Sequence, residues 1–584
     1  MTDIDELARR RGLFFQANEA YGGVAGFLTY GPTGTALKRN IEASWRDRFV
    51  REEGNLEIDA PTVTPEAVLS ASGHVDTFDD MLVECPACGQ SHRADHLVEA
   101  HADVADAESL PPAEIEARIA EYDVTCPACG TALTDEPVTE FNLMFETSIG
   151  PGDGDPGYLR PETAQGMFVE FPRLKEYARG QLPFGVAQIG TGYRNEISPR
   201  NALLRAREFT MAELEQFVNP AEDDPPLDRV ADVEVPLYTA DAQQADTTTY
   251  EHLTVAEALD TGTINGDWIA YFVGVSAQWF TEIGVDPDRF RFRQHLPGEL
   301  SHYATDCWDA EAEVDGDWIE LEGIANRTDY DLSKHASHAD DDFTVFEQYD
   351  EPRTVERPRV DPDMAALGPE FGSDAEAIAD ALNAKAERDP EAFDGEVVTV
   401  EVDGSTYDVP TAHTNFSIEE VTEAGHHVRP HVIEPAFGIG RAVYTVVAHR
   451  YDTDEIDGER RDVLRLPTAI APTTVAVFPL MARDGLGDRA ESLADTLRAN
   501  GVDVIYDDTG AIGRRYRRQD EVGTPFCLTV DYDTLDEDTV TLRERDSTDQ
   551  LRLPVDGLAD TLTALRDGDR SFAALREEYP AVDR

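Results

Sequence analysis

Apolar residues recur at every fourth position between residues 35 and 50, which predicts a helix with one buried face. Four side chains form that face: Leu37, Ile41, Trp45 and Phe49. A short extended segment follows at residues 56–60 and ends before Pro61. Because proline donates no backbone hydrogen bond, we expect this strand at the edge of a sheet or at a subunit contact. By itself the unit is typical of any helix that covers a sheet.

Charged and apolar residues alternate in residues 190–217, GTGYRNEISPRNALLRAREFTMAELEQF, which predicts two strands around a Ser-Pro-Arg-Asn turn. In an extended second strand one face would carry Arg205, Arg207, Phe209, Met211, Glu213, Glu215 and Phe217. Arginine binds phosphate oxygens through a planar fork and a carboxylate neutralises an amine, so this face suits a polyphosphate and an ammonium group. An exposed amphipathic hairpin would give the same pattern.

Two other segments place carboxylates at expected elements. Glu162 lies at the entry to a helix that residues 158–166 predict, where the helix dipole alone would favour it. Residues 317–331 predict a strand with Glu320 and Glu322 on the same side. Paired carboxylates on a sheet suit magnesium, which prefers oxygen ligands and phosphate neighbours. A solvated acidic strand is the alternative.

Residues 431–451 predict a strand, a glycine turn and an apolar helix. Gly438 and Gly440 allow close approach of the backbone, and Arg441 falls in the first helical turn. Free amides, the helix dipole and a guanidinium would then converge where a phosphate could bind. An ordinary glycine-rich connection is the alternative.

Beyond about residue 467 the pattern predicts a compact βαβ-type domain. Its expected strands are residues 474–479, 502–506 and 526–530, and its expected helix is residues 488–500. It contains the densest basic cluster of the chain: Arg514, Arg515, Tyr516, Arg517 and Arg518. Guanidiniums around an aromatic ring suit an RNA backbone and an unstacked base, although part of the cluster must face the domain's own acidic surface.

Composition limits these interpretations. With 584 residues the chain is too long for one core, so we expect two or three domains. Asp and Glu number 118 against 49 Lys and Arg, a net charge of -69, and the basic residues are almost all arginine. This resembles proteins from salt-loaded cytoplasm, because the Debye length falls to about 3 Å at molar salt and self-repulsion is screened. A hydrophobic content of 41% argues against a disordered acidic chain.

The chain shows no signal peptide and no apolar run of membrane-spanning length, so we expect a cytoplasmic protein without membrane contact. Four of its six cysteines form two CPACG knuckles: Cys85, Cys88, Cys126 and Cys129. Four thiolates satisfy tetrahedral zinc, which predicts a structural site that closes an insertion with helical, acidic residues 94–122. Two cysteine hairpins without metal are the alternative. Cys307 and Cys527 are expected to be core thiols.

Taken together, these segments resemble the glycyl-tRNA synthetases of the archaeal and eukaryotic type, which are class II aminoacyl-tRNA synthetases. The resemblance runs through RRGLFFQANEAYGGVAGFLTYGP at residues 10–32, Pro61 as the motif 1 proline and LRPETAQG at residues 159–166. It continues through RNE and REF of motif 2, HYATDCWDAE at residues 302–311 and VIEPAFGIGR of motif 3. With its acidic composition the chain is similar to a halophilic archaeal member.

The resemblance implies an α+β catalytic domain with an antiparallel sheet, a zinc-ribbon-like insertion and a C-terminal α/β anticodon-binding domain. The catalytic domain would span residues 1–466, with the four-cysteine insertion at about residues 84–140 and acidic insertions at about 219–262 and 345–410. Residues 467–584 would form the anticodon-binding domain. The family is dimeric through motif 1, so the resemblance implies a homodimer.

The implied activity is that of a glycine–tRNA ligase, which forms glycyl-adenylate from glycine and ATP and transfers glycine to the 3′ end of tRNA(Gly). Arg194 and Arg441 would be catalytic, and the family pattern places further residues at ATP: Asn195, Glu196, Leu204, Arg205, Ala206, Arg207, Glu208, Phe209, Glu320, Leu321, Gly438, Ile439 and Gly440. Glycine would contact Arg93, Glu162, Phe209, Thr210, Met211, Ala212, Glu213, Glu434, Pro435, Ala436, Phe437 and Gly438. Glu320 and Glu434 would hold magnesium, and the basic cluster would bind tRNA.

The chain departs from the family at Ala436, where a serine hydroxyl commonly contacts glycine. Three alternatives stay open. The first is another class II synthetase, which would lack the pair Glu162 and Glu213. The second is a noncatalytic relative such as a polymerase accessory subunit, which would be expected to lose Arg194 or Arg441. The third is a zinc-dependent binding protein, in which Arg194 and Arg441 would have no role. Amino-acid-dependent exchange of pyrophosphate into ATP, in molar salt, separates these alternatives.

Overall fold

The computed structural model describes residues 3–101, 107, 110–152, 154–199, 202–222, 224–245, 247–299, 306–402, 404–456 and 458–582. Several features expected from the sequence fall partly outside these ranges, among them residues 200–201 of the turn in the hairpin and residues 302–305 of the HYATDCWDAE segment. The chain divides into two compact units. One comprises residues 1–343 and 429–584, and the other residues 344–428.

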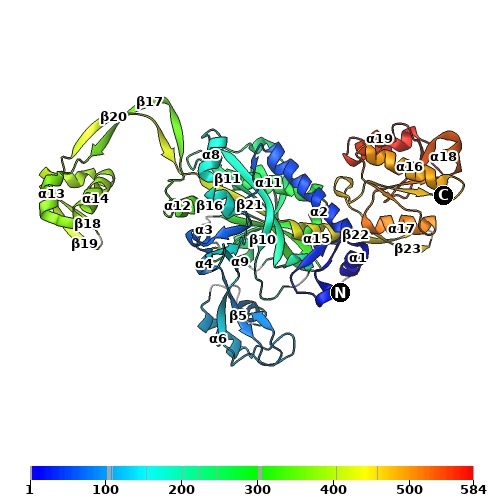
Figure 1. Ribbon diagram of the computed structural model, residues 1–584, viewed down its shortest axis with the longest axis horizontal. Helices are drawn as coiled ribbons and strands as arrows, with labels where there is room; N and C mark the ends of the chain where they lie inside the picture. Colours follow the sequence, from blue (N-terminus) through cyan, green and yellow to red (C-terminus); the bar gives the residue numbers. More distant parts are fainter. Residues whose placement is uncertain are drawn as a thin grey trace. The chain divides into compact units, whose positions relative to one another are not determined.

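The first unit is built on a nine-stranded sheet with the strand order β13-β12-β14-β15-β16-β21-β11-β10-β3 (Figure 1). Its strands are β3 (Leu56–Glu57), β10 (Phe184–Tyr193), β11 (Glu208–Val218), β12 (Glu234–Tyr238), β13 (Glu251–Thr254), β14 (Phe290–Gln294), β15 (Cys307–Val314), β16 (Asp317–Thr328) and β21 (His431–Gly438). All neighbours are antiparallel except β10 with β3 and β12 with β14. The edge position of β3 confirms the expectation from Pro61.

Three helices cover the apolar face of this sheet: α2 (Pro32–Trp45), α11 (Asp267–Glu282) and α15 (Ile439–Arg450). A π-helical turn at Arg46–Glu52 continues α2. The four residues of the predicted stripe are fully buried, which confirms the prediction. Phe49 stacks on Trp45 at 5.2 Å between ring centroids and lies 4.8 Å from Phe437 of β21, so the aromatic rings join helix to sheet. Each buried ring contributes roughly 1.5–3 kcal/mol.

The hairpin forms as β10 and β11, but the predicted extent of both strands is wrong. β10 begins at Phe184, and β11 begins only at Glu208, so the predicted face does not include Arg205 and Arg207. The guanidinium of Arg207 donates hydrogen bonds to the backbone oxygens of Glu196 and Ala25, which holds this stretch in a loop. From Phe209 onward the alternation holds, and Glu213 lies opposite Gln188.

The predicted common side of Glu320 and Glu322 is also wrong. Glu311 of β15 pairs with Glu320, but the preceding residue, Ala310, pairs with Glu322, so β16 carries one extra residue at Leu321. Such a bulge reverses the alternation of side chains on either side of it. Glu322 is therefore buried against α11, where it accepts a 2.7 Å hydrogen bond from the Ser276 hydroxyl. Glu320 points to the opposite, open face.

The four-cysteine insertion has its own sheet, of order β6-β5-β7, and its own core. The strands are β5 (Asp79–Glu84), β6 (Ser91–Arg93) and β7 (Val138–Asn142), and the helices are α5 (Ala94–Glu99) and α6 (Pro112–Glu121). The predicted helical character of residues 94–122 is thus observed in two helices. Residues 102–106 and 108–109 lie between them, outside the described part.

The C-terminal part of the first unit has a five-stranded sheet of order β25-β24-β26-β27-β28. Its strands are β24 (Val475–Pro479), β25 (Val504–Tyr506), β26 (Phe526–Val530), β27 (Thr539–Glu544) and β28 (Gln550–Pro554), and its helices include α16 (Leu486–Ala499), α17 (Ile512–Val522) and α19 (Leu558–Arg566). β24, β25 and β26 are parallel, as a βαβ-type unit requires. The three strands and the helix predicted there are confirmed within two residues.

The second unit is a long two-stranded ribbon, β17 (Val345–Arg359) and β20 (Ser417–Val428), whose far end carries a small core (Figure 1). That core lies between α13 (Met364–Phe371), α14 (Ala375–Arg388), β18 (Val397–Val402) and β19 (Ser405–Pro410). Across the described part of the whole chain, every helix is too short or too polar to span a lipid bilayer.

Candidate active site

One cavity lies on the open face of the nine-stranded sheet. Its walls contain the following residues assigned by the family resemblance: Glu162, Arg194, Glu196, Leu204, Arg205, Ala206, Phe209, Thr210, Met211, Glu213, Glu320, Glu434, Ala436, Gly438, Gly440 and Arg441. Its walls also contain residues to which the sequence assigned no role in the site: Leu203, His295, Cys307, Asp309, Gly323, Ala325 and Arg327.

Strand alternation explains why other assigned residues do not line this cavity. Ala212, Leu321, Phe437 and Ile439 belong to the hydrophobic core on the opposite face of the sheet. Asn195, Arg207, Glu208 and Pro435 neighbour lining residues in the chain but are absent from the walls themselves. Their side chains therefore do not face the cavity, whatever their backbones contribute.

A row of register partners across four strands forms the floor of the cavity. Glu213 of β11 lies opposite Ala436 of β21, Ala436 lies opposite Gly323 of β16, and Gly323 lies opposite Asp309 of β15. Neighbouring strands are about 4.8 Å apart, so the two carboxylates stand on the order of 14 Å apart. Only a methyl group and a hydrogen atom separate them on this row, which leaves the floor open for a ligand.

The carboxylate of Glu213 is fully buried at one end of this row. It accepts hydrogen bonds from the backbone N–H, at 2.6 Å, and from the hydroxyl of Thr163, which precedes α7 (Ala164–Val169). Burial, together with repulsion from Glu162 and Glu434, raises the pKa of Glu213 to about 8. A cation placed here would relieve that repulsion.

The surroundings of Glu162 shift its pKa in the direction opposite to that of Glu213. Burial acts to raise its pKa, but His74, whose Nε2 lies 3.5 Å from Oε1, outweighs burial together with Arg327 and Arg194. The pKa of Glu162 is therefore held below its ordinary value. The cavity thus has one carboxylate kept ionised beside another, Glu213, that holds its proton until a cation arrives.

Arg327 of β16 organises this acidic end. Its Nη1 lies 2.8 Å from Oε2 of Glu434, and its Nε and Nη2 donate to Asp331 at 2.8 and 3.0 Å. Burial raises the pKa of Glu434 despite the neighbouring guanidinium. No motif in the sequence marked Arg327, because its partners come from β21 and from the start of α12 (Tyr330–Ala336).

The other end of the cavity is basic. Arg441, in the first turn of α15, donates to the backbone oxygens of Leu204 and Glu320 at 3.2 and 2.9 Å and pairs with Oε2 of Glu320 at 3.1 Å. This guanidinium lowers the pKa of Glu320. The guanidinium of Arg194 lies over the ring of Phe209, 5.5 Å from its centroid, which fixes its direction.

Glu196 and Arg205 pair at 2.6 Å in the wall of the cavity. Glu320 and Glu434, expected to share magnesium, are not brought together. Glu434 lies opposite Ala325, which is five positions after Glu320 on β16, so about 15 Å of strand separates the two carboxylates.

Arg93 lies away from this cavity, in the four-cysteine insertion. It pairs with Asp80 at 2.7 Å and with Asp95. Burial raises the pKa of Asp80 to about 6 in spite of Arg93. The guanidinium is therefore engaged in holding β5, β6 and α5 together.

A third group of polar side chains lines the cavity: His295, Cys307 and Asp309. His295 Nε2 lies 2.8 Å from Asp309 Oδ2. Burial opposes a charged imidazole, but hydrogen bonds to Asp309 and Cys307 outweigh it and raise the pKa of His295 to about 11. The expectation that Cys307 is a core thiol is right about its burial, but its side chain also lines the cavity. Cys527 is a buried core thiol, as expected.

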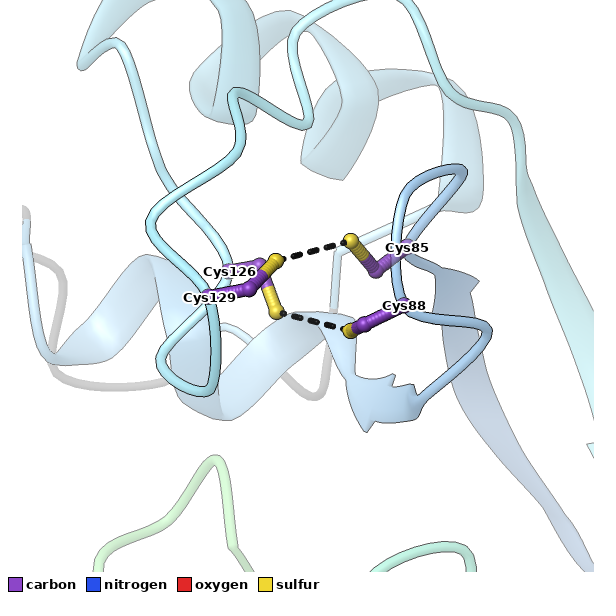
Figure 2. Close-up of side chains that lie close together, drawn as sticks. All are labelled: Cys85, Cys88, Cys126 and Cys129. Atoms are coloured by element: carbon purple, nitrogen blue, oxygen red, sulfur yellow. Dashed lines mark hydrogen bonds between the residues drawn. The ribbon is translucent and has the colours of Figure 1, made fainter.

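The four knuckle cysteines converge (Figure 2). The sulfur atoms of Cys85 and Cys129 lie 3.5 Å apart, and those of Cys88 and Cys126 lie 3.7 Å apart. Tetrahedral zinc with Zn–S bonds of about 2.3 Å requires sulfur atoms about 3.8 Å apart. The four side chains therefore fit a zinc ion. His92 Nε2 lies 3.2 Å from Sγ of Cys126, a position from which an imidazole N–H stabilises a thiolate ligand.

The basic cluster lies on α17 and is partly used within its own domain. Arg515 is buried and donates to the backbone oxygens of Pro479, Asp508 and Gly510. Arg518 pairs with Asp507, and the Tyr516 hydroxyl bonds to Thr529. Arg517 lies 3.7 Å from Glu459. Arg514 is exposed and has no partner among the described residues.

Comparison with known proteins agrees with this architecture. Residues 474–565 match the family model "Anticodon binding domain". Curated proteins named glycine–tRNA ligase are similar over almost the whole length: 47% identity for Methanothrix thermoacetophila, over 98% of both chains, and 44% for Archaeoglobus fulgidus, over 100% of both. The protein of Methanocaldococcus jannaschii is 44% identical over 96% of this chain and 98% of its own. A solved prolyl-tRNA synthetase of Cryptosporidium parvum, 11% identical, covers 97% of this chain and 77% of that chain with a TM-score of 0.48.

An anticodon-binding domain attached to a catalytic domain with an antiparallel sheet defines a class II aminoacyl-tRNA synthetase. Within that class the full-length relatives at 44 and 47% identity carry a single name, and the chain belongs to the glycine–tRNA ligase family.

Proposed function

We propose that this protein activates glycine with ATP and transfers the glycyl group to the 3′ end of tRNA(Gly). The observation that carries the proposal is the polarity of the cavity. Buried carboxylates stand at one end, arginines stand at the other, and a floor of small residues lies between them. This matches the two charged ends of the reactants, an ammonium group and a polyphosphate.

At the acidic end, Glu162 and Glu213 would receive the ammonium group of glycine. Glu162 is already ionised, and Glu213 releases its proton as the cation binds, because the ammonium replaces the repulsion that raised its pKa. The carboxylates, Thr163 and Arg327 crowd this end. We propose that they leave no room for a β-carbon, so steric exclusion selects glycine without an editing site.

At the basic end, Arg194 would bind the α-phosphate, Arg441 the γ-phosphate and Glu196 the adenine. Glycine's carboxylate oxygen then attacks the α-phosphorus, the bond to the bridging oxygen breaks, and pyrophosphate leaves with its electron pair. The terminal ribose hydroxyl of tRNA next attacks the glycyl carbonyl, and AMP leaves. The guanidiniums supply charge neutralisation and in-line positioning, with no covalent enzyme intermediate.

Magnesium would be held at Glu320, whose carboxylate stays ionised beside Arg441 and lies at the phosphate end. When bound, it would neutralise phosphate charge and orient pyrophosphate as a leaving group. Glu434 would serve the acidic end instead, because its partner is Arg327.

Zinc in the four-cysteine cluster would be structural, since four protein ligands leave no open position. We also propose a cytoplasmic homodimer adapted to high salt, with residues 1–466 as the catalytic domain and residues 467–584 as the anticodon-binding domain. The composition and the family support these points. Arg514 and the exposed parts of Arg517 and Arg518 would contact tRNA.

The test is exchange of pyrophosphate into ATP with each amino acid in turn, in molar potassium chloride. We expect exchange with glycine and roughly 5- to 150-fold less exchange with alanine or serine, because a methylene that does not fit costs about 1–3 kcal/mol. Equal exchange with alanine, or none with glycine from protein that circular dichroism shows to be folded, would overturn the proposal.

A further inference from the structure

The side chains of His295, Cys307 and Asp309 converge in the wall of the cavity. One ligand atom from each, a nitrogen, a sulfur and an oxygen, lies within 4.8 Å of the other two. The backbone fixes this arrangement, since the N–H of His295 donates to the carbonyl of Cys307 at 2.9 Å and Asp309 follows on the same face of β15. The three groups are thus placed by paired strands rather than by a free loop.

We propose that His295, Cys307 and Asp309 form a binding site for a divalent transition-metal ion of the zinc class, with an open coordination position that faces the cavity. Three protein ligands and one open position are the arrangement of exchangeable zinc sites, whereas four ligands make a closed structural site. A thiolate and an imidazole select zinc or cobalt over magnesium, so this site differs in chemistry from the carboxylate of Glu320.

The distances allow such an ion with small movements. Zinc bonds of about 2.0–2.3 Å place ligand atoms roughly 3.3–3.8 Å apart, so the 2.8 Å contact between His295 and Asp309 would open by less than about 1 Å. Asp309 Oδ2 also lies 3.8 Å from Arg293, but that guanidinium is bound to Glu299 at 2.6 Å. The three ligands are largely buried, so few waters compete for the ion.

The test counts metal ions on the full-length protein after its four-cysteine cluster has been filled with zinc. Cobalt(II) is then added, followed by gel filtration and elemental analysis. We expect wild type to bind one cobalt ion more per chain than Cys307→Ser, with a thiolate-to-cobalt absorption band that the variant lacks. Cys527→Ser, which removes another buried thiol, should keep both the extra ion and the band.

Equal cobalt content in wild type and Cys307→Ser, or a band that survives in the variant, would overturn the proposal and leave the three residues as a hydrogen-bonded part of the cavity wall. If Cys307→Ser fails to fold, His295→Gln gives the same reading, because loss of the imidazole should weaken cobalt binding at least about tenfold. The count does not depend on aminoacylation, so its failure leaves the proposed function standing.

Discussion

The carboxylate of Glu213 accepts two hydrogen bonds from Thr163, one from its backbone N–H and one from its hydroxyl. These bonds join β11 to the residue that precedes α7, fifty positions away in the chain. A carboxylate held so firmly cannot move to accommodate a larger ligand. The direction of the proposed ammonium site is therefore set by the fold.

Glu213→Gln should weaken glycine binding strongly. The amide keeps the shape of the side chain but removes the negative charge, and a hydrogen bond to a charged group contributes about 1.5–3 kcal/mol, or roughly 10- to 150-fold in the KM for glycine. The KM for ATP should change little. Steady-state pyrophosphate exchange measures both, with Glu251→Gln on the exposed strand β13 as the control. An unchanged KM for glycine would remove Glu213 from the ammonium site.

The ionisation of Glu322 should make the stability of the folded protein depend on pH. This side chain is fully buried, its Oε2 has no partner among the described residues, and burial raises its pKa well above the ordinary value. The folded protein keeps this proton after the unfolded chain has lost it near pH 4.3. The contribution of Glu322 to the free energy of unfolding is therefore greatest below that pH and falls as pH rises towards the folded pKa.

Glu322→Gln should accordingly stabilise the protein at pH 8 by about 1–3 kcal/mol, the penalty of a buried unsatisfied group, and should stabilise it less at pH 5. Thermal unfolding followed by circular dichroism in molar potassium chloride measures the difference. Asp317→Asn, at the exposed start of the same strand, should show no such pH dependence. Equal effects of Glu322→Gln at both pH values would show that Glu322 is ionised in the folded state.

Arg441→Lys should lower kcat/KM for ATP about a hundredfold or more, because lysine is a point charge and cannot make the planar, two-pronged contact of a guanidinium. The KM for glycine should stay unchanged, because Arg441 lies at the opposite end of the cavity from Glu213. Arg450→Lys, at the other end of α15, is the matched control. Full activity of Arg441→Lys would exclude Arg441 from phosphate binding.

Ala436→Ser should change the KM for glycine only modestly, by no more than about fivefold, because a neutral hydrogen bond contributes about 1 kcal/mol. The added hydroxyl would stand on the floor of the cavity between Glu213 and Gly323, where room exists. Glycine-dependent exchange measures it. Loss of adenylate formation would show that the floor of the cavity cannot accommodate a hydroxyl group at position 436.

Cys88→Ser should remove the zinc ion from the four-cysteine cluster, because a hydroxyl is a poor fourth ligand for zinc. We expect one zinc ion fewer per chain and faster proteolysis between residues 85 and 130, where the two knuckles face one another. Cys527→Ser should keep the zinc content of wild type. Equal zinc in the Cys88→Ser and wild-type proteins would contradict a four-thiolate site.

Local periodicity was enough to predict α2, the strand and helix around Arg441, and the strands of the C-terminal sheet. Each of these depends on residues within one turn or one strand. The contacts of Arg327 with Glu434 and of His295 with Asp309 could not be predicted in this way, because they depend on strand order and register. The extent of β11 was predicted wrongly for a similar reason, because the side chain of Arg207 donates a hydrogen bond to the backbone oxygen of Ala25, far away in the sequence.

The extra residue in β16 interrupts the regular alternation of side chains between the two faces of the sheet. If the same residues formed a regular strand without the bulge, strict alternation would place the carboxylates at positions 320 and 322 on one face, so either both would face the cavity or both would face the interior. The bulge, and not the identity of the residues alone, decides which glutamate faces the cavity and which is buried in the interior. A change in strand register that removed the bulge would therefore misplace one of the two carboxylates even if every catalytic side chain were retained.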